Sequence, residues 1–501
     1  MKAFIFPTYL AGVAVLSVLP CINAQGSLPV LNKSSTCTEE CQQLVPLAIA
    51  FEHDSHAHMP LDDFYSIPSN FTPSMKPGSL LRVEIHTNLI NYTVPSGLTM
   101  SRIMYTSQSL NGTVVPVSAF VLWPYTPFAY RVGKQKNKPH TKQPAPPNFP
   151  LVAWAHGTSG QFVDCAPSNY RSLQYHFMTS YSLALEGFAV IATDYAGLGV
   201  STLPNGEQSH AYLAGPAGAN DVAFAIEAVR KAFPDQLEEE GPFITMGHSQ
   251  GGNVAWAFAE RQAKMPVPGY LGTIAISPPL RVIDGLNQAL QKIATTALSS
   301  LPIWASTTLS LQPVYIAAIT SVFPSYNFSG MSPISYDRWQ NVLKPLQGCT
   351  PTYNLAYADV PPNQLANPGW TNNSFVKQWQ DQVHVSGRNF KGPLLVIAGS
   401  DDVVSLDEIS SGVDASCKAS GNQNLEMYVY SAMEHFPVIQ ASRMKWMTWI
   451  KDMFTGNSKS DRSCGKKTAV QGFNTNHTIQ SITPNWLVDW VPPTDRWELS
   501  L

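Results

Sequence analysis

The chain has 501 residues and a formal net charge of −3, a length that predicts either two domains or one large domain with insertions. No basic patch or Lys/Arg repeat stands out, so nucleic acid is not expected as a partner. Charged residues make up only 13% of the chain, about half their usual share, which suggests a surface rich in small polar side chains and sugar.

The first 24 residues have the layout of a cleaved secretory signal. Lys2 precedes an apolar stretch over residues 10–19, and Ile22-Asn23-Ala24 stands before Gln25. The apolar stretch is too short to span a bilayer. We therefore expect a secreted, extracellular protein that begins near Gln25, and the absence of an apolar tail argues against a C-terminal lipid anchor.

Six cysteines remain after Cys21 leaves with the signal, and an even count in a secreted chain predicts three disulfides. Six cysteines allow 15 pairings, among which the sequence does not choose. The candidates are Cys37, Cys41, Cys165, Cys349, Cys417 and Cys464. Sequons for N-glycosylation begin at Asn32, Asn70, Asn91, Asn111, Asn327, Asn372 and Asn476.

Short β-rich and apolar runs alternate with helical patterns along most of the chain. Residues 101–124 form two β-rich runs around Asn111-Gly112, which predicts an antiparallel hairpin, and residues 131–149 are expected to be an exposed loop. Later strands are predicted at 150–155, 188–193, 243–246, 270–276, 394–398 and 425–430, with helices at 219–233, 253–263 and 438–454. This alternation predicts an α/β fold with a mostly parallel central sheet covered on both faces.

The most informative motif is Gly247-His248-Ser249-Gln250-Gly251, directly after the predicted strand at 243–246. A Gly-x-Ser-x-Gly sequence between a strand and a helix is typical of a sharp turn that exposes a nucleophilic serine. Gly247 and Gly251 would leave room for that turn. Ser249 is therefore the candidate nucleophile.

About 110 residues separate the strand ending near Ser277 from the one beginning near Leu394, more than a crossover needs. This insertion is a candidate lid or cap. Residues 293–336 contain no Asp, Glu, Lys, Arg or His, and Leu286, Leu290, Ile293 and Ala297 repeat at helical spacing. Prolines at 302, 313 and 324 should break the stretch into short helices, which either pack on the main domain or line an acyl-chain pocket.

A serine nucleophile needs an imidazole to remove its proton and a carboxylate to orient that imidazole. Asp402 follows the predicted strand at 394–398 and is our choice for the acid, with Asp401 and then Asp284 as alternatives. His435 lies in the loop before the final helix and is the candidate base. The expected order of Ser, acid and His is thereby met.

The oxyanion formed during acyl transfer needs two backbone donors. Gln250 supplies one, and Gly157 or Thr158, after the strand at 150–155, supplies the other. Asp194 and Tyr195 end a neighbouring strand and are candidates for substrate binding, although a structural turn explains them equally well.

The remaining histidines have other expected roles. His248 should point away from the nucleophile, and His156 should order its loop. The close group of His53, His56 and His58 with Asp54 lacks a fourth ligand at a recognisable spacing, so no metal site is predicted.

These motifs resemble the secretory lipases of the lipase A type, found in fungi and bacteria, within the α/β-hydrolase superfamily. The similarity covers most of the chain after the signal. It includes residues 62–65, 77–82, 155–158, 193–195 and 247–252 together with the Asp402 and His435 loops. The resemblance implies a Ser-Asp-His triad, a helical lid between the sixth and seventh strands, and hydrolysis of carboxylic esters without a cofactor.

The resulting hypothesis is a serine carboxylesterase or triacylglycerol lipase. Its expected parts are a signal peptide (1–24), the N-terminal part of a hydrolase core (25–280), a lid or cap (281–390), and the C-terminal part of the core with a tail (391–501). We expect a monomer that binds an ester or lipid substrate and makes transient contact with a lipid interface. The alternatives are a secreted serine aminopeptidase or tripeptidyl peptidase, and a catalytically silent fold that binds hydrophobic ligands.

Overall fold

A computed structural model of the chain describes residues 34–130, 148–201, 210–421, 423–457 and 464–471. The predicted signal sequence, most of the predicted loop at 131–149, and the sequons at Asn32 and Asn476 lie outside the described residues. Within them, no helix is long and apolar enough to cross a membrane.

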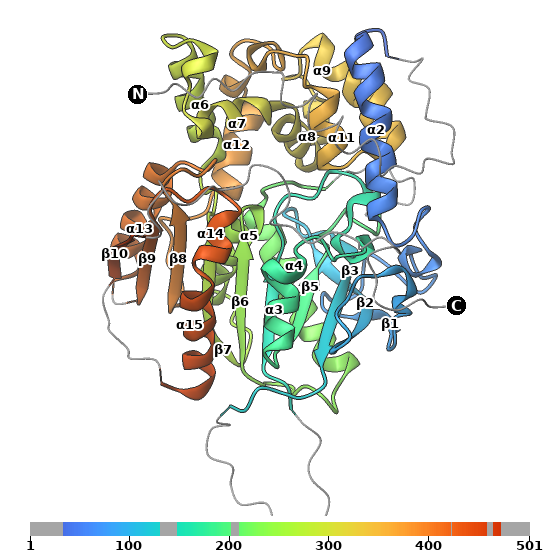
Figure 1. Ribbon diagram of the computed structural model, residues 1–501, viewed down its shortest axis with the longest axis vertical. Coiled ribbons are helices and arrows are strands. Elements are labelled where there is room, and N and C mark those ends of the chain that lie inside the picture. Colours follow the sequence, from blue (N-terminus) through green and yellow to red (C-terminus); the bar gives the residue numbers. More distant parts are fainter. Residues whose placement is uncertain (1–33, 131–147, 202–209, 422, 458–463, 472–501) are drawn as a thin grey trace, which may run out of the picture.

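One mixed sheet forms the centre of the molecule (Figure 1). Its ten described strands are ordered β1-β2-β3-β5-β4-β6-β7-β8-β9-β10. The strands from β5 onward in this order pair in parallel, and β1, β2, β3 and β5 pair antiparallel. The strands are β1 Leu80–Glu84, β2 Leu98–Gln108, β3 Val114–Pro124, β4 Leu151–Ala155, β5 Ala189–Thr193, β6 Phe243–His248, β7 Tyr270–Ile276, β8 Leu394–Gly399, β9 Leu425–Tyr430 and β10 Cys464–Val470.

Helices cover both faces of this sheet. Apolar side chains of α4, α5 and α13 pack on one face, and those of α3, α14 and α15 pack on the other, so the predicted α/β architecture is confirmed. The helices are α2 Glu39–Ser55, α3 Ser180–Leu185, α4 Gly215–Ala232, α5 Gln250–Gln262, α6 Val282–Ile293, α7 Ile303–Ser310, α8 Gln312–Val322, α9 Pro333–Arg338, α10 Lys344–Leu346, α11 Thr350–Ala356, α12 Ser374–Val383, α13 Leu406–Ser420, α14 Pro437–Ala441 and α15 Arg443–Thr455.

The hairpin formed by β2 and β3 agrees with its predicted turn. The two strands pair in continuous antiparallel register, from Gln108 opposite Val114 to Leu98 opposite Pro124. Gly112, in the turn, has φ of +87°, a conformation that glycine adopts without steric cost. This hairpin carries the antiparallel side of the sheet.

Two predicted helices differ from the structure. The helix that the spacing extends to Ala297 ends at Ile293, where the β-branched Thr295 follows in a turn. The single helix predicted over 438–454 is the pair α14 and α15. The Ser442 hydroxyl between them donates to the Val438 carbonyl at 2.7 Å, a bond that commonly bends or interrupts helices.

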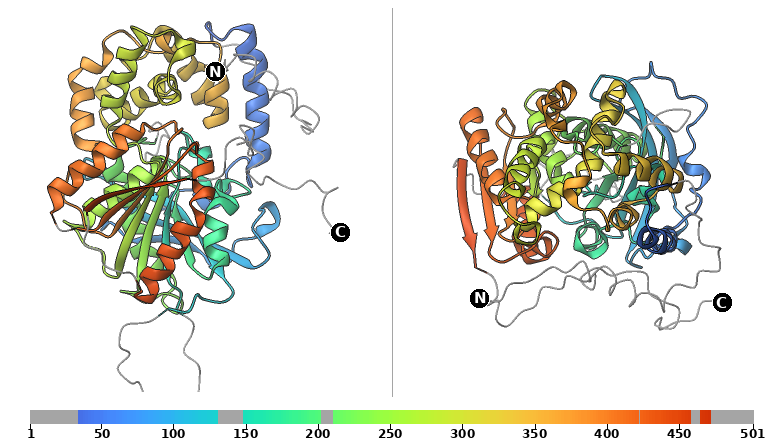
Figure 2. Two further views of the ribbon diagram at one scale, coloured as in Figure 1. Left: turned by 60° about the vertical axis from the view of Figure 1, so that its left-hand side comes forward. Right: turned by 90° about the horizontal axis from the view of Figure 1, so that it is seen from above.

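The helices α6 to α12 lie between β7 and β8 in sequence and gather beyond one end of the sheet (Figures 1 and 2). We call them the cap. The N-terminal helix α2 joins the same group, because its buried side chains share one apolar cluster with those of the cap. Glu52 of α2 accepts hydrogen bonds from the backbone N–H groups of Cys349, at 2.9 Å, and Thr352, at 2.7 Å, at the start of α11. The sequence pattern does not predict this role for α2.

Three disulfides pair the six predicted cysteines: Cys37–Cys41, Cys165–Cys349 and Cys417–Cys464. The second of them is a covalent link between the core and the cap. Among the sequons within the described residues, Asn91 is half-buried, and the asparagines at 70, 111, 327 and 372 are exposed.

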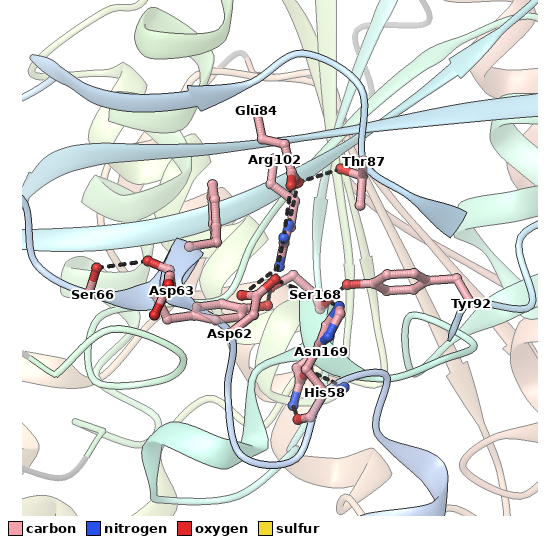
Figure 3. A network of polar contacts seen from close by, with 12 residues as sticks. His58, Asp62, Asp63, Ser66, Glu84, Thr87, Tyr92, Arg102, Ser168 and Asn169 are labelled. Atoms are coloured by element: carbon pink, nitrogen blue, oxygen red, sulfur yellow. Dashed lines mark hydrogen bonds and ion pairs between the residues drawn. The ribbon is translucent and has the colours of Figure 1, made fainter. Parts of the chain in front are cut away.

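A polar network fixes the N-terminal segment to the sheet (Figure 3). Arg102 of β2 is almost fully buried, and its guanidinium forms ion pairs with Asp62 and Glu84, each at 2.6 Å. His58 lies 3.7 Å from the same Asp62 carboxylate. Because both carboxylates meet one cation, the buried charge of Arg102 is compensated. These contacts give the residues around 62–65 a structural role.

Candidate active site

The turn that carries Ser249 lies between β6 and α5. Ser249 has φ +57° and ψ −123°, a strained backbone conformation of the kind found at active sites. A Cβ atom on Gly247 would lie 2.0 Å from the carbonyl oxygen of Gly251, and one on Gly251 would lie 1.9 Å from that of Ala155. Only glycine fits at either position, because the backbones of β4, β6 and α5 approach one another closely here. This close approach explains why the motif contains glycine on both sides of Ser249.

Asp402 and His435 are brought together by the loops after β8 and β9. His435 Nδ1 lies 2.6 Å from Asp402 Oδ1. The other carboxylate oxygen of Asp402 accepts from the Ser277 hydroxyl at 2.5 Å, and the Val404 N–H donates to Oδ1 at 2.9 Å. Burial alone would raise the pKa of Asp402, but the charge of His435 and these hydrogen bonds outweigh burial and lower that pKa. Asp402 is therefore an ionised partner for His435.

The two alternative acids lie elsewhere. Asp401 is exposed and accepts a hydrogen bond from the Ser400 hydroxyl at 2.8 Å. Asp284 forms a surface ion pair with Arg281 at 2.5 Å. Of the three carboxylates proposed from the sequence, only Asp402 contacts His435.

His248 contacts the site, in a role that the sequence pattern did not assign to it. One ring nitrogen, Nε2, lies 2.9 Å from the backbone carbonyl of His435, and Nδ1 lies 2.8 Å from the Tyr175 phenol oxygen. Burial, followed by the charge of His435, lowers the pKa of His248 well below its usual value. A neutral His248 therefore supports the backbone of the His435 loop. Its position before the nucleophile gives no signal of this contact, which forms across 187 residues of sequence.

Gly157 and Thr158 lie beside the serine. A Cβ atom on Gly157 would lie 3.2 Å from that of Ser249 and 2.1 Å from the Tyr175 phenol oxygen. Burial raises the pKa of Tyr175, and a hydrogen bond from the Gly157 backbone N–H lowers it in part. Thr158 and Ser249 line the same pocket. The Thr158 hydroxyl lies 2.8 Å from the Tyr212 phenol oxygen.

Gln250 begins α5 directly after the nucleophile, and its side chain is buried. The side-chain nitrogen lies 2.6 Å from His210 Nε2. This contact fixes the Gln250 side chain. The backbone N–H of Gln250 lies in the first turn of the helix and has no acceptor within the helix, so it is free to bind another group.

Asp194 and Tyr195 do not line the pocket, contrary to the substrate-binding role considered for them. Asp194 is fully buried and accepts from the hydroxyls of Ser118, at 2.6 Å, and Ser168, at 2.5 Å. Tyr195 is also buried, and its hydroxyl donates to the His156 carbonyl at 3.0 Å. Loop contacts thus account for both residues.

His156 orders its loop, as predicted. One ring nitrogen lies 2.7 Å from the Gly157 carbonyl oxygen and the other lies 3.2 Å from that of Asp194. Burial lowers the pKa of His156 to about 3, so the ring is neutral and serves these two contacts.

A pocket of about 240 Å³ contains Ser249 and His435 on its wall. The uncharged cap stretch contributes Trp304, Leu311 and Tyr315 to this wall, together with two threonines. The other described lining residues are Thr158, Tyr175, Tyr212, Leu213, Pro279, Val282, Gly285, Thr350, Asn354, Val403, Val404, Ser405, Glu408 and Phe436. The stretch predicted from its lack of charge therefore faces the candidate nucleophile across a cavity.

Glu408 is the only carboxylate among these described lining residues. It belongs to α13 of the core, and its Oε1 atom accepts from the backbone N–H groups of Leu280, at 2.7 Å, and Arg281, at 2.6 Å. The sequence pattern did not single it out, because a glutamate in the first turn of a helix is common and its contacts with Leu280 and Arg281 form only in the fold.

Together the sheet order, the strained serine turn and the Asp402–His435 pair define the α/β-hydrolase fold with a helical cap. The chain is similar to a family model described as serine aminopeptidase, S33, over residues 171–340. No curated protein sequence matches the chain.

Three solved structures illustrate the similarity of fold. Candida antarctica lipase A in its closed state is 16% identical with a TM-score of 0.62, over 82% of this chain and 89% of that one. The rice cell wall degrading esterase LipA of Xanthomonas oryzae is 17% identical with a TM-score of 0.53, over 75% and 97%. A putative hydrolase of Legionella pneumophila is 16% identical with a TM-score of 0.55, over 76% and 98%. The resemblance inferred from the motifs is thereby confirmed at the level of the fold.

Proposed function

We propose that the protein is a serine carboxylic ester hydrolase in which Ser249 is the nucleophile, His435 the general base and Asp402 the residue that orients His435. The observation that carries this proposal is the 2.6 Å contact between His435 and Asp402 at a pocket that Ser249 also lines. With Nδ1 held by a carboxylate, Nε2 of His435 is left to take the serine proton.

In the proposed reaction, the Ser249 hydroxyl oxygen attacks the ester carbonyl while His435 takes its proton. The intermediate then releases the alcohol, to which His435 returns the proton, and an acyl-enzyme remains. Water, deprotonated by His435, cleaves that acyl-enzyme and regenerates Ser249. No cofactor is required.

The oxyanion would be held by the backbone N–H groups of Gln250 and Thr158. Gln250 supports this role because it occupies the first turn of α5. Thr158 is preferred to Gly157, because Thr158 lines the pocket together with Ser249 and Gly157 is not among its described lining residues.

We propose acylglycerols or other esters of apolar acyl chains as substrates. The uncharged cap wall supports this choice, because apolar groups contact such a wall without a desolvation cost. The pocket has a volume of about 240 Å³, which leaves room for an apolar acyl chain beside Ser249. Rates measured for esters from acetyl to long-chain acyl, with and without an oil interface, should be higher for longer acyl chains than for acetyl and should increase at the interface. A preference for acetyl esters with no gain at an interface would contradict this assignment.

The variant Ser249→Ala tests the reaction itself. It should reduce hydrolysis of an activated ester by about 10⁴-fold or more, because the other residues alone provide little catalysis. Unchanged hydrolysis by the folded variant would refute the role of Ser249.

A serine aminopeptidase is the second candidate. It is favoured by the description of the matching family model and by Glu408, a carboxylate of the kind that holds a free amino terminus. Rates on an ester and an anilide of the same acyl group separate the two, since a peptidase should also cleave the anilide efficiently. A fold that only binds hydrophobic ligands would cleave neither.

We further infer a secreted, glycosylated protein that acts as a monomer and meets a lipid interface transiently. Three disulfides support this inference, because such bonds persist in oxidising compartments. The exposed sequons are compatible with it.

A further inference from the structure

Glu408 and the aromatic residues Tyr212 and Tyr315 line the pocket that also contains the candidate nucleophile. Thr158, close to Ser249, bonds through its hydroxyl to the phenol of Tyr212 at 2.8 Å. The rings of Tyr212 and Tyr315 stack with centroids 6.2 Å apart and an angle of 14° between their planes. All of these residues and Glu408 line one pocket.

The carboxylate of Glu408 is only partly satisfied by the protein. Its Oε1 atom accepts the two backbone N–H groups at the start of the cap. Its Oε2 atom has no hydrogen-bond partner among the described residues, and no Lys or Arg stands among the described lining residues of the pocket. The nearby Arg281 is committed to Asp284 at 2.5 Å. Burial raises the pKa of Glu408, and the two backbone N–H groups partly oppose this effect. A cation bound in the pocket would favour the ionised carboxylate and would meet its free oxygen.

Tyr315 and Glu408 line the same pocket. Burial, then Tyr212, then Glu408 raise the pKa of Tyr315 well above its usual value. Trp304 lines the same cavity from α7 of the cap, but the Lys292 ammonium already lies 5.8 Å from the centroid of its ring. This leaves Tyr315 as the aromatic residue that acts with Glu408. Aromatic faces beside a carboxylate are the surroundings that bind alkylammonium groups.

We propose that Glu408 is a specificity-determining residue that, with Tyr315, favours ester substrates carrying an alkylammonium group. This inference rests on the proposed ester hydrolysis and narrows its substrate class. The apolar part of the wall receives the hydrocarbon portion of such an ester, and the carboxylate receives its positive charge. Glu408 itself takes no part in bond cleavage.

The test compares two esters of the same shape that differ by one charge, butyrylcholine and 3,3-dimethylbutyl butyrate. The ratio of kcat/KM for the charged to the neutral ester should be about ten or more for the unaltered protein, and should fall to about one for Glu408→Gln. The glutamine retains a side-chain oxygen for Leu280 and Arg281. Asp407→Asn, which removes an exposed charge from the adjacent residue, should leave the ratio unchanged.

A ratio near one for the unaltered protein, or a ratio that Glu408→Gln does not change, would overturn the proposal. If Glu408→Gln does not fold, competition on the unaltered protein replaces it. Tetramethylammonium should inhibit hydrolysis of the neutral ester at concentrations at least tenfold lower than tert-butanol does, and equal inhibition would overturn the proposal.

A binding experiment distinguishes failure of the Glu408 proposal from failure of the proposed ester hydrolysis. If neither ester is hydrolysed, calorimetry of tetramethylammonium with the full chain still tests the site, and binding of the cation would support it. Absence of binding would overturn the role of Glu408 whatever reaction the protein catalyses.

Discussion

At the scale of single residues, the account depends on which carboxylate orients His435. Asp402 is buried and its pKa is lowered by its partners, whereas the adjacent Asp401 is exposed. Asp402→Asn should lower kcat by about 10³- to 10⁴-fold, because an amide no longer fixes the imidazole tautomer. Asp401→Asn is the matched control and should alter kcat by less than about threefold. Equal losses in the two variants would show that the acid is wrongly assigned.

The residues of the candidate site were predictable to different degrees. Ser249, Asp402 and His435 could be predicted because each of them follows a predicted strand, in the order Ser, Asp, His. The carboxyl ends of parallel strands lie at the same edge of the sheet, so the three residues come together there. His248 and Glu408 were not predictable, because their contacts are made through backbone groups of distant segments. Asp194 follows a strand in the same way, but its carboxylate accepts hydrogen bonds from Ser118 and Ser168. Only the fold brings these two serines to it, so the sequence contains no sign of this structural role.

At the scale of elements, the strands from β2 to β9 were predicted almost to their ends, because short β-branched runs between turn residues carry a clear pattern. The edge strands β1 and β10 were not predicted. The cap was predicted as an insertion without charge, and its prolines do separate the short helices α7 and α8. The membership of α2 in this group was not predicted. Its packing on the cap depends on tertiary contacts such as that of Glu52, for which local sequence has no signal.

The Cys165–Cys349 disulfide gives a prediction at this scale, because it ties the core to the cap. Replacing both cysteines by serine should lower the free energy of unfolding by about 2–5 kcal/mol, since the link closes a long loop in the unfolded chain. The midpoint of denaturant unfolding measures this change. The Cys37–Cys41 pair closes a loop of only four residues in separation, so the same replacement there should cost less. A larger loss at Cys37–Cys41 would contradict this explanation.

At the scale of the whole molecule, buried carboxylates contribute to the change of stability with pH. Burial raises the pKa of Glu52, Asp221 and Glu260 to about 7 in each case. The native protein therefore binds protons that the unfolded chain releases at lower pH. Their contribution to stability is complete below the unfolded values near 4 and is lost as pH rises to about 7. Asp402 has the opposite sign, so its contribution is lost as pH falls below its usual range.

Buried histidines such as His56, His156 and His210 contribute with the opposite sign, because burial lowers their pKa values and the unfolded chain takes up their protons first as pH falls. The contribution of Glu52 is therefore measured with a variant. Glu52→Gln is neutral at every pH, so its thermal midpoint relative to that of the unaltered protein should rise from pH 5 to pH 8. Glu40→Gln, on the exposed surface of the same helix, should show no such change. A difference between Glu52→Gln and the unaltered protein that is the same at both pH values would refute this view of Glu52.

The central claim is that Ser249 is an activated nucleophile, and labelling with a fluorophosphonate tests it most directly. Only a serine whose hydroxyl is deprotonated by a neighbouring base reacts with such a probe. The account predicts one adduct per chain, located by peptide mass analysis on Ser249, with parallel loss of ester hydrolysis and no adduct in Ser249→Ala. An unlabelled protein, or an adduct on another residue with hydrolysis intact, would contradict it.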